Sequence, residues 1–188
     1  MVRAPTIALL IAAAPAAAIP TPADRGDWAL AALSGGCMVQ AASSRGTALS
    51  VWGFAGQQRL GFLIQNREWD SLREGQLYAL HVAFDGATAW PVEATGRSAI
   101  DSEGPGLFFT VTPGRKSDQA GFVEAFAAAQ GMRVTRAGAD AESLPLAGSG
   151  GAMAALAQCL AEIWGGSGPP GGRRGAPGVL PAGLAWPL

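Results

Sequence analysis

The sequence predicts an α+β domain in which one curved antiparallel sheet of six to eight short strands carries two packed helices, near residues 118–130 and 150–163. Three observations lead to this class. Short runs of apolar and β-branched residues follow one another, glycine-containing turns join them, and two later segments repeat apolar residues at helical spacing. The nearest alternative is a small half-open barrel.

The first half of the domain is predicted to be a meander of extended segments. Residues 28–33 form either an edge strand or an irregular lead-in. Three further segments are short, rich in strand-forming residues and bounded by turn residues: 37–43, 47–54 and 59–65. Residues 66–75 then gather five charged side chains. Asn66 and Gly75 are suitable cap residues, so a short helical turn is expected between them.

The strand expected at 77–84 has the clearest alternation, and its larger apolar side chains share one face: Tyr78, Leu80, Val82 and Phe84. Asp85-Gly86 predicts a tight turn into another extended piece at 90–92. Pro91 cannot donate to a strand ladder, which favours an edge position for that piece. A polar loop at 98–106 precedes a strand at 107–112.

Both helices lie in the last third of the chain. Ser117 is a suitable cap for the first, which ends at Gly131 and carries one apolar stripe: Phe122, Val123, Phe126 and Ala127. Short strands are expected at 132–136 and 143–147. The second helix starts after Gly148-Ser149, ends at Gly165-Gly166 and has a second apolar stripe: Met153, Leu156, Leu160 and Ile163.

Composition excludes several classes of function. The chain has 188 residues, enough for one domain with a sizeable core, and its 13 basic and 14 acidic side chains nearly balance. A nucleic-acid surface needs a dense basic footprint, which scattered arginines do not supply. One histidine and two cysteines exclude most zinc ligand sets. We therefore expect no nucleic-acid partner, no metal and no cofactor.

Residues 1–18 predict a secretory signal peptide. A basic start leads into an uncharged apolar run at 6–18, and Ala16 and Ala18 stand three and one residues before Ile19. A membrane anchor is the alternative, but a spanning helix needs about 20 apolar residues and this run has 13. No later segment is long and apolar enough to span a bilayer. The expected location is therefore the periplasm, or outside the cell, without a transmembrane segment.

The remaining chain is expected to form a single globular domain over residues 19–164 and a tail over residues 165–188. The tail holds 8 glycines and 5 prolines in 24 residues. Such a segment buries too little apolar surface to offset its ordering entropy, which predicts disorder. The alternative is that apolar residues near its end dock on the domain: Val179, Leu180, Leu184 and Trp186.

Cys37 and Cys159 predict a disulfide, because an even cysteine count in an oxidising compartment favours pairing. It would join the strand that carries Cys37 to the final helix. A lipoprotein would need its cysteine directly after the apolar run, and Leu33–Cys37 follows charged residues instead. A thiol nucleophile would need a basic neighbour, which neither cysteine has in sequence.

Candidates for catalysis are few. His81 is the only imidazole and lies in mid-strand, opposite the large apolar side chains. A glycan hydrolase needs two carboxylates, and the pairs Glu68/Asp70 and Asp101/Glu103 both lie in turn-rich segments where charge is expected anyway. These patterns favour a protein that is not an enzyme.

Three tryptophans lie in or beside the predicted sheet and could line an aromatic groove: Trp52, Trp69 and Trp90. Core packing explains the same three positions equally well. The groove therefore stays one of two interpretations of these residues.

The segment Leu146–Cys159, with its Gly-Ser turn and alanine-rich helix bearing a cysteine, resembles the ending of many small exported bacterial proteins of unknown function. Gly26-Asp27-Trp28 followed by Cys37, together with this ending, is similar to the invasion-associated locus B proteins. The resemblance covers about a third of the chain, and this sequence lacks that family's further cysteines near the start and in the middle. It implies an exported, non-catalytic envelope protein and supplies no site residues.

Together these observations predict an exported, non-enzymatic, disulfide-stapled binding or interaction module of the cell envelope. Its partner would be an envelope protein or a wall component. The alternatives are a carboxylate-dependent cell-wall hydrolase that uses residues such as Glu68 or Asp70, and a small-ligand carrier.

Overall fold

The computed structural model describes residues 27–42, 46–87, 89–98, 103–113, 121–136 and 139–165. The predicted signal peptide at 1–18 and the tail beyond Gly165 lie outside these residues, as do Ser117 and Asp101. Among the described residues, neither helix combines the length and the apolar character needed to cross a bilayer.

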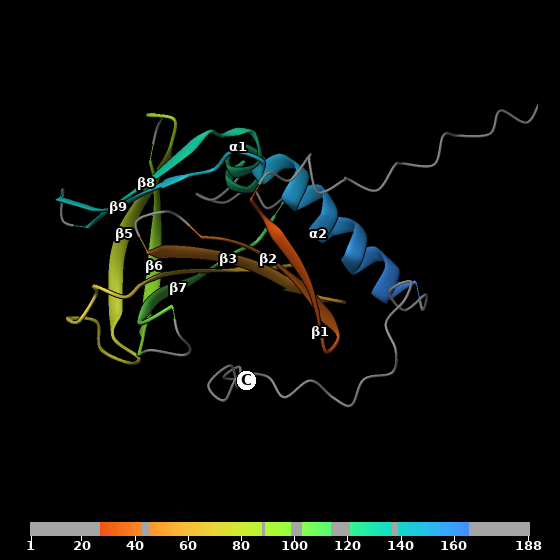
Figure 1. Cartoon of the computed structure of the whole chain (residues 1–188), viewed down its shortest axis with the longest axis horizontal. Coiled ribbons are helices and arrows are strands. Elements are labelled where there is room, and N and C mark those ends of the chain that lie inside the picture. The colour runs from red at the N-terminus through yellow and green to blue at the C-terminus, as the bar shows by residue number, and fades with distance from the viewer. Residues whose placement is uncertain are drawn as a thin grey trace, which may run out of the picture.

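The α+β class is confirmed: one open antiparallel sheet of nine strands carries two helices (Figure 1). The nine strands exceed the six to eight expected. They pair in the order β1-β2-β3-β4-β7-β6-β5-β8-β9. Their bounds are β1 Ala29–Leu33, β2 Gly36–Ala42, β3 Thr47–Phe54, β4 Leu60–Asn66, β5 Leu77–Phe84, β6 Trp90–Arg97, β7 Gly106–Val111, β8 Gly131–Arg136 and β9 Ala139–Pro145.

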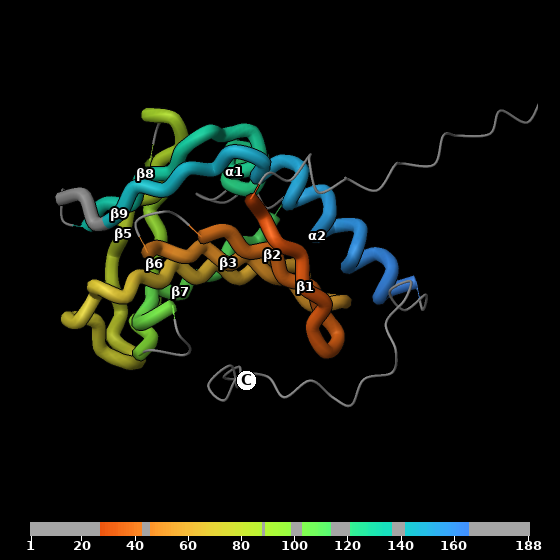
Figure 2. The backbone as a smooth tube through the Cα atoms, viewed as in Figure 1, coloured from red at the N-terminus to blue at the C-terminus, as the bar shows by residue number. Residues whose placement is uncertain are grey.

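The sheet is strongly curved, and both helices lie on its inner side. In Figures 1 and 2, β2 and β3 run across the direction of β5 and β6, with β7 between the two groups. Helix α1 (Phe122–Ala128) sits inside the bend, and α2 (Ser149–Trp164) extends from it over β1 and β2. Each strand alternates side chains between two faces, so the curved sheet has an inner face, under the helices, and an outer face.

A cluster of aromatic rings fills the inner face. Phe62 of β4 stacks on Phe109 of β7 with ring centroids 5.3 Å apart, and its edge meets Phe122 and Phe126 of α1, each at 5.4 Å. Phe84 of β5 also contacts Phe122, at 5.0 Å. Strands from both halves of the sheet therefore pack against the same short helix, α1.

Two expectations for local structure are wrong. Residues 66–75 form hydrogen-bonded turns instead of a helical turn, because the Asn66 side chain accepts the N–H of Glu68 at 2.8 Å and closes the chain locally. The first helix begins at Phe122, behind Gly121 in the left-handed region with φ of 79°. It is therefore shorter than the segment 118–130.

The edge position expected for Pro91 is also wrong. β6 lies inside the sheet, between β5 and β7. Proline is tolerated there because β7 pairs only with Thr95–Arg97, so its ladder ends before it reaches Pro91.

Candidate functional site

An open sheet leaves two edge strands, and here they differ in composition. β9 carries Asp140, Glu142 and Pro145 in its sequence, and its ladder with β8 has a register shift at Val134/Thr135. Charges, proline and irregular register are the features that protect an edge strand from pairing with another chain. The β9 edge is therefore protected.

The opposite edge, β1, has none of these features. Its sequence is Ala-Leu-Ala-Ala-Leu, without charge or proline, and the side chains from Ala29 to Ala32 are exposed. The apolar side chain of Leu30 is among them, and this residue keeps 38% of its surface in water. Within the part of the chain that the structure describes, β1 pairs only with β2, so its other side is an unprotected strand edge.

The turn that follows β1 determines which backbone groups face outward. Ser34 and Gly35 form a two-residue turn, with Gly35 at φ of 73°, and Leu33 and Gly36 are the closing pair. The closing pair of such a hairpin exchanges hydrogen bonds, and an antiparallel ladder alternates from there. The N–H and C=O groups of Leu30 and Ala32 therefore point away from β2.

The hairpin is held firmly at three points. Before β1, the indole N–H of Trp28 donates to the carbonyl of Ala147 at 3.1 Å. At the turn, the N–H of Ala55 donates to the carbonyl of Gly35 at 3.0 Å. A preformed strand loses less conformational entropy on binding than a loose one.

The third point is the predicted disulfide, which the structure confirms. Cys37 of β2 is bonded to Cys159 of α2, and their Cα atoms are 6.2 Å apart. It links the strand beside β1 to the helix above it, as expected, and leaves no free cysteine. Cys37 pairs in register with Ala32. The covalent anchor is therefore one strand away from the exposed edge.

The three groove tryptophans do not converge on one surface. Trp90 lies on the inner face, with its ring 5.3 Å from Phe84 and 5.8 Å from Phe122. Trp52 lies on the outer face, stacked on Phe108 at 5.5 Å. Trp69 is half-buried in the 66–75 turns and packs against the inner core. Two of the three are thus on opposite sides of the sheet.

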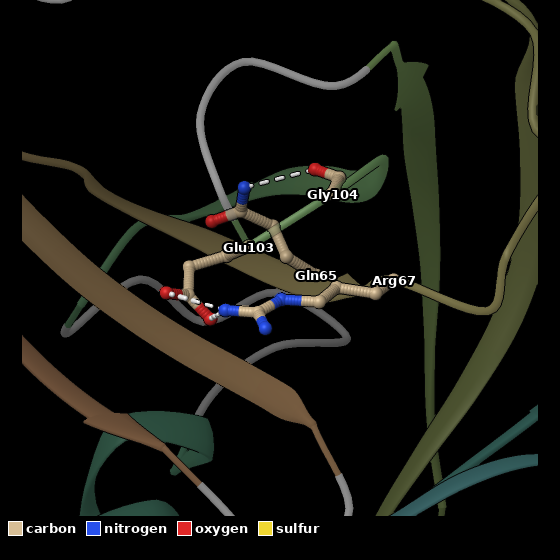
Figure 3. A network of polar contacts seen from close by, with 4 residues as sticks. All are labelled: Gln65, Arg67, Glu103 and Gly104. Atoms are coloured by element: carbon tan, nitrogen blue, oxygen red, sulfur yellow. Dashed lines mark hydrogen bonds and ion pairs between the residues drawn. The ribbon is translucent and has the colours of Figure 1, made fainter.

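The candidate catalytic residues lie on the surface. Glu68, Asp70 and His81 are all exposed. Glu103 contacts Arg67 at 3.4 Å, next to a hydrogen bond of 3.1 Å from the Gln65 amide to the carbonyl of Gly104 (Figure 3). These contacts hold the loop before β7 against β4. Among the described residues, no three potential metal ligands cluster.

A polar cluster that the sequence analysis missed joins distant strands at the inner face. The Glu142 carboxylate of β9 accepts hydrogen bonds from the Thr47 hydroxyl at 2.8 Å and the Asn66 amide at 3.0 Å. Both donors are buried. Local pattern gives no sign of this contact, because Glu142 is 95 residues from Thr47 and 76 from Asn66. It ties the protected edge to the ends of β3 and β4.

A surface hollow of about 730 Å³ lies where β5 ends beside β8 and β9. Met132 and Leu144 are its buried apolar wall, and Asp85 is at its rim. The Asp85 carboxylate already accepts the N–H groups of Gln130 and Gly131, at 3.0 and 2.8 Å. None of the groove tryptophans lines this hollow.

The environment of Glu74 favours its charged form. The backbone N–H of Ser98 donates to it at 2.7 Å and the Arg97 guanidinium at 2.8 Å. First this backbone hydrogen bond and then the arginine lower the pKa of Glu74 below its ordinary value of 4.5. The contact joins the 66–75 turns to the end of β6.

Replacing Glu74 with glutamine is expected to reduce the acid sensitivity of folding. Because the folded-state pKa is the lower one, this contribution to stability is complete above the unfolded value and is lost as pH falls through the folded value. The free energy of unfolding of Glu74→Gln, measured by urea titration from pH 7 to pH 3, should therefore fall less steeply below pH 4.5 than that of the unsubstituted chain. Parallel curves would contradict this assignment.

Comparison with known proteins gives no match: no family model, no curated protein and no solved structure matches this chain.

Proposed function

We propose that this protein is an exported binding module of the cell envelope that adds an extended segment of a partner protein to its sheet at β1. The observation that carries the proposal is the bare edge of β1, which is uncharged and exposed and lacks the protective features of β9. Unpaired edge strands are the template for recognition by strand addition.

The disulfide supports the location in this proposal. Disulfides form and persist in oxidising compartments, and the bond between Cys37 and Cys159 closes over a separation of 122 residues. This supports export to the periplasm or beyond, where the partner would be another envelope protein. The signal peptide expected at 1–18 is part of the same proposal.

An added strand would gain backbone hydrogen bonds first. The outward N–H and C=O groups of Leu30 and Ala32 offer two donors and two acceptors to an antiparallel or parallel partner. Small side chains along β1 leave the edge open, and Leu30 supplies an apolar contact. The partner segment would therefore be extended, with alternate apolar residues, and not helical.

Ala32→Pro tests the edge directly. Proline removes the outward N–H of residue 32, while the ladder with β2 uses its neighbours on either side. We expect partner retention to fall by about tenfold or more, equivalent to about 1.4 kcal/mol of binding free energy. The measurement is the amount of each partner retained by tagged protein from its own periplasmic fraction, by quantitative mass spectrometry.

A matched pair of lysine substitutions separates the edge from exposed apolar area in general. Leu30→Lys places a charge on the edge, whereas Leu77→Lys places it on β5, six strands from β1 in the sheet, where Leu77 pairs with Thr95 of β6. Leu77 is the more exposed of the two, at 60%. Binding should be lost with Leu30→Lys and kept with Leu77→Lys. A partner retained equally by Ala32→Pro, Leu30→Lys and Leu77→Lys would show that β1 is not the site.

A further inference from the structure

Helix α2 follows strand β1 along its length, and both run in the same direction (Figure 1). Near the start of both elements, the Trp28 indole donates to the carbonyl of Ala147. Toward the far end, Cys159 of α2 is bonded to Cys37, which pairs with Ala32 of β1. A strand added to β1 would therefore lie beside one flank of this helix.

Alternate side chains of an added strand would face α2. Leu30 of β1 pairs with Val39, which is fully buried in the inner-face core. Ala32 pairs with Cys37, whose sulfur is bonded to α2. Directly opposite residues of an antiparallel pair share a face, so Leu30 and Ala32 both point to the helix side of the sheet. The two partner residues opposite them would point the same way, with one residue between them.

Two contacts determine which side of α2 faces this edge. Cys159 reaches β2, whereas a Cβ atom at Gly53 of β3 would lie 2.9 Å from Leu160, the next helix residue. Successive helix residues are about 100° apart around the axis, so the side toward β1 lies beyond Cys159 and away from Leu160. Residues three and seven positions apart share that side, which we call the α2 flank: Ala155, Gln158 and Glu162. The first of these is buried and the other two are half-buried.

Glu162 gives the α2 flank a negative end. It is the one charged residue in the sequence of α2, and β1 has none. It lies in the last turn of the helix, where the backbone carbonyls already carry a partial negative charge, so a carboxylate there does not stabilise the helix. The neighbour that donates to its Oε1, at 3.4 Å, is the uncharged amide of Gln158. Helix end and carboxylate together attract a cation.

We propose that Glu162 selects a lysine or arginine in the strand that β1 receives, an inference that rests on the proposed strand addition. Helix residues rise 1.5 Å each, so Glu162 lies about 4.5 Å beyond Cys159 and past the level of Ala32. A long basic side chain opposite Ala32 can extend over that distance. The position opposite Leu30 lies beside the small Ala155, which leaves room for an apolar side chain. The partner segment would therefore carry an apolar and a basic residue two positions apart.

Selection from a phage-displayed library of random ten-residue peptides tests this choice, with the oxidised full chain as the target. Selected peptides that lose binding to Ala32→Pro are the ones that add to the edge, and we call them edge peptides. We expect them to contain lysine or arginine two positions from an apolar residue. For a synthetic, fluorescein-labelled edge peptide, Glu162→Gln should raise the Kd measured by fluorescence anisotropy about three- to fivefold. High salt should reduce this difference, because it screens the ion pair.

Charge exchange separates recognition from a merely structural effect. Glu162→Lys should prefer the version of the edge peptide in which glutamate replaces the basic residue. Glu93→Gln, which removes the same charge from an exposed position of β6, should leave the Kd unchanged. Edge peptides without a basic residue, bound equally by Glu162→Gln and the unsubstituted chain, would overturn this inference and leave strand addition in place. Selected peptides that all bind Ala32→Pro as well as the unsubstituted chain would instead contradict strand addition at β1, and this inference with it.

Discussion

Replacing Cys37 and Cys159 together by alanine is expected to lower the free energy of unfolding by about 4–5 kcal/mol. The bond spans 122 residues, so it removes a large loop entropy from the unfolded chain. It also joins β2 to the helix that covers it, so its loss loosens the β1 hairpin. Urea denaturation of the oxidised protein and of the double variant measures the difference.

The reduced form of the unsubstituted chain is the matched control. Dithiothreitol should bring its unfolding midpoint to that of the double alanine variant and should leave the variant itself unchanged. Single variants are less informative, because each leaves one free thiol. Oxidised and reduced proteins with midpoints that agree within experimental error would show that the bond contributes nothing to stability.

The second large effect is expected at Phe122, where truncation to alanine should cost about 3–5 kcal/mol. This ring is completely buried on α1 and contacts Phe62, Phe84 and Trp90 with centroids 5.0 to 5.8 Å apart. These partners belong to both halves of the curved sheet, so a cavity here weakens the packing between them. The same urea titrations, under oxidising conditions, give the value.

Val123→Ala is the control for Phe122→Ala. Val123 is the next residue of α1 and only half-buried, and alanine has the higher helix propensity, so the change should cost about 1 kcal/mol or less. If the two variants lost equal stability, the fold would depend on the integrity of α1 and not on the ring cluster.

Much of the fold could be predicted because strand and helix periods are local properties. The alternation in 77–84 placed Tyr78, Leu80, Val82 and Phe84 on one face, and all four are buried. Asp85 and Gly86 do form the expected turn, with φ of 48° and 76°. Predictions of this kind depend only on residues that are close together in the chain.

Strand order could not be predicted in the same way. β4 pairs with β7, not with β5, and that choice places β6 inside the sheet despite Pro91. Such pairings depend on contacts between distant residues, which a repeating pattern does not specify. The contact of Glu142 with Thr47 and Asn66 is another example.

The site was predictable only in part. The even cysteine count and the expectation of export led to the pairing of Cys37 with Cys159, and 28–33 was predicted to be either an edge strand or an irregular lead-in. Which strands become the two edges, and so which edge is bare and which is protected, depends on the strand order of the whole sheet. The tryptophans show the same limit, because the faces of Trp52 and Trp90 follow from register across four strands.

The central claim is that β1 receives an added strand, and residue-resolved amide hydrogen exchange tests it most directly. In the free protein the amides of Leu30 and Ala32 should exchange fast, because their N–H groups point away from β2. With a partner bound, we predict that both slow by about tenfold or more while Leu77 is unchanged. A bound partner that leaves Leu30 and Ala32 exchanging at their free rates would contradict the claim.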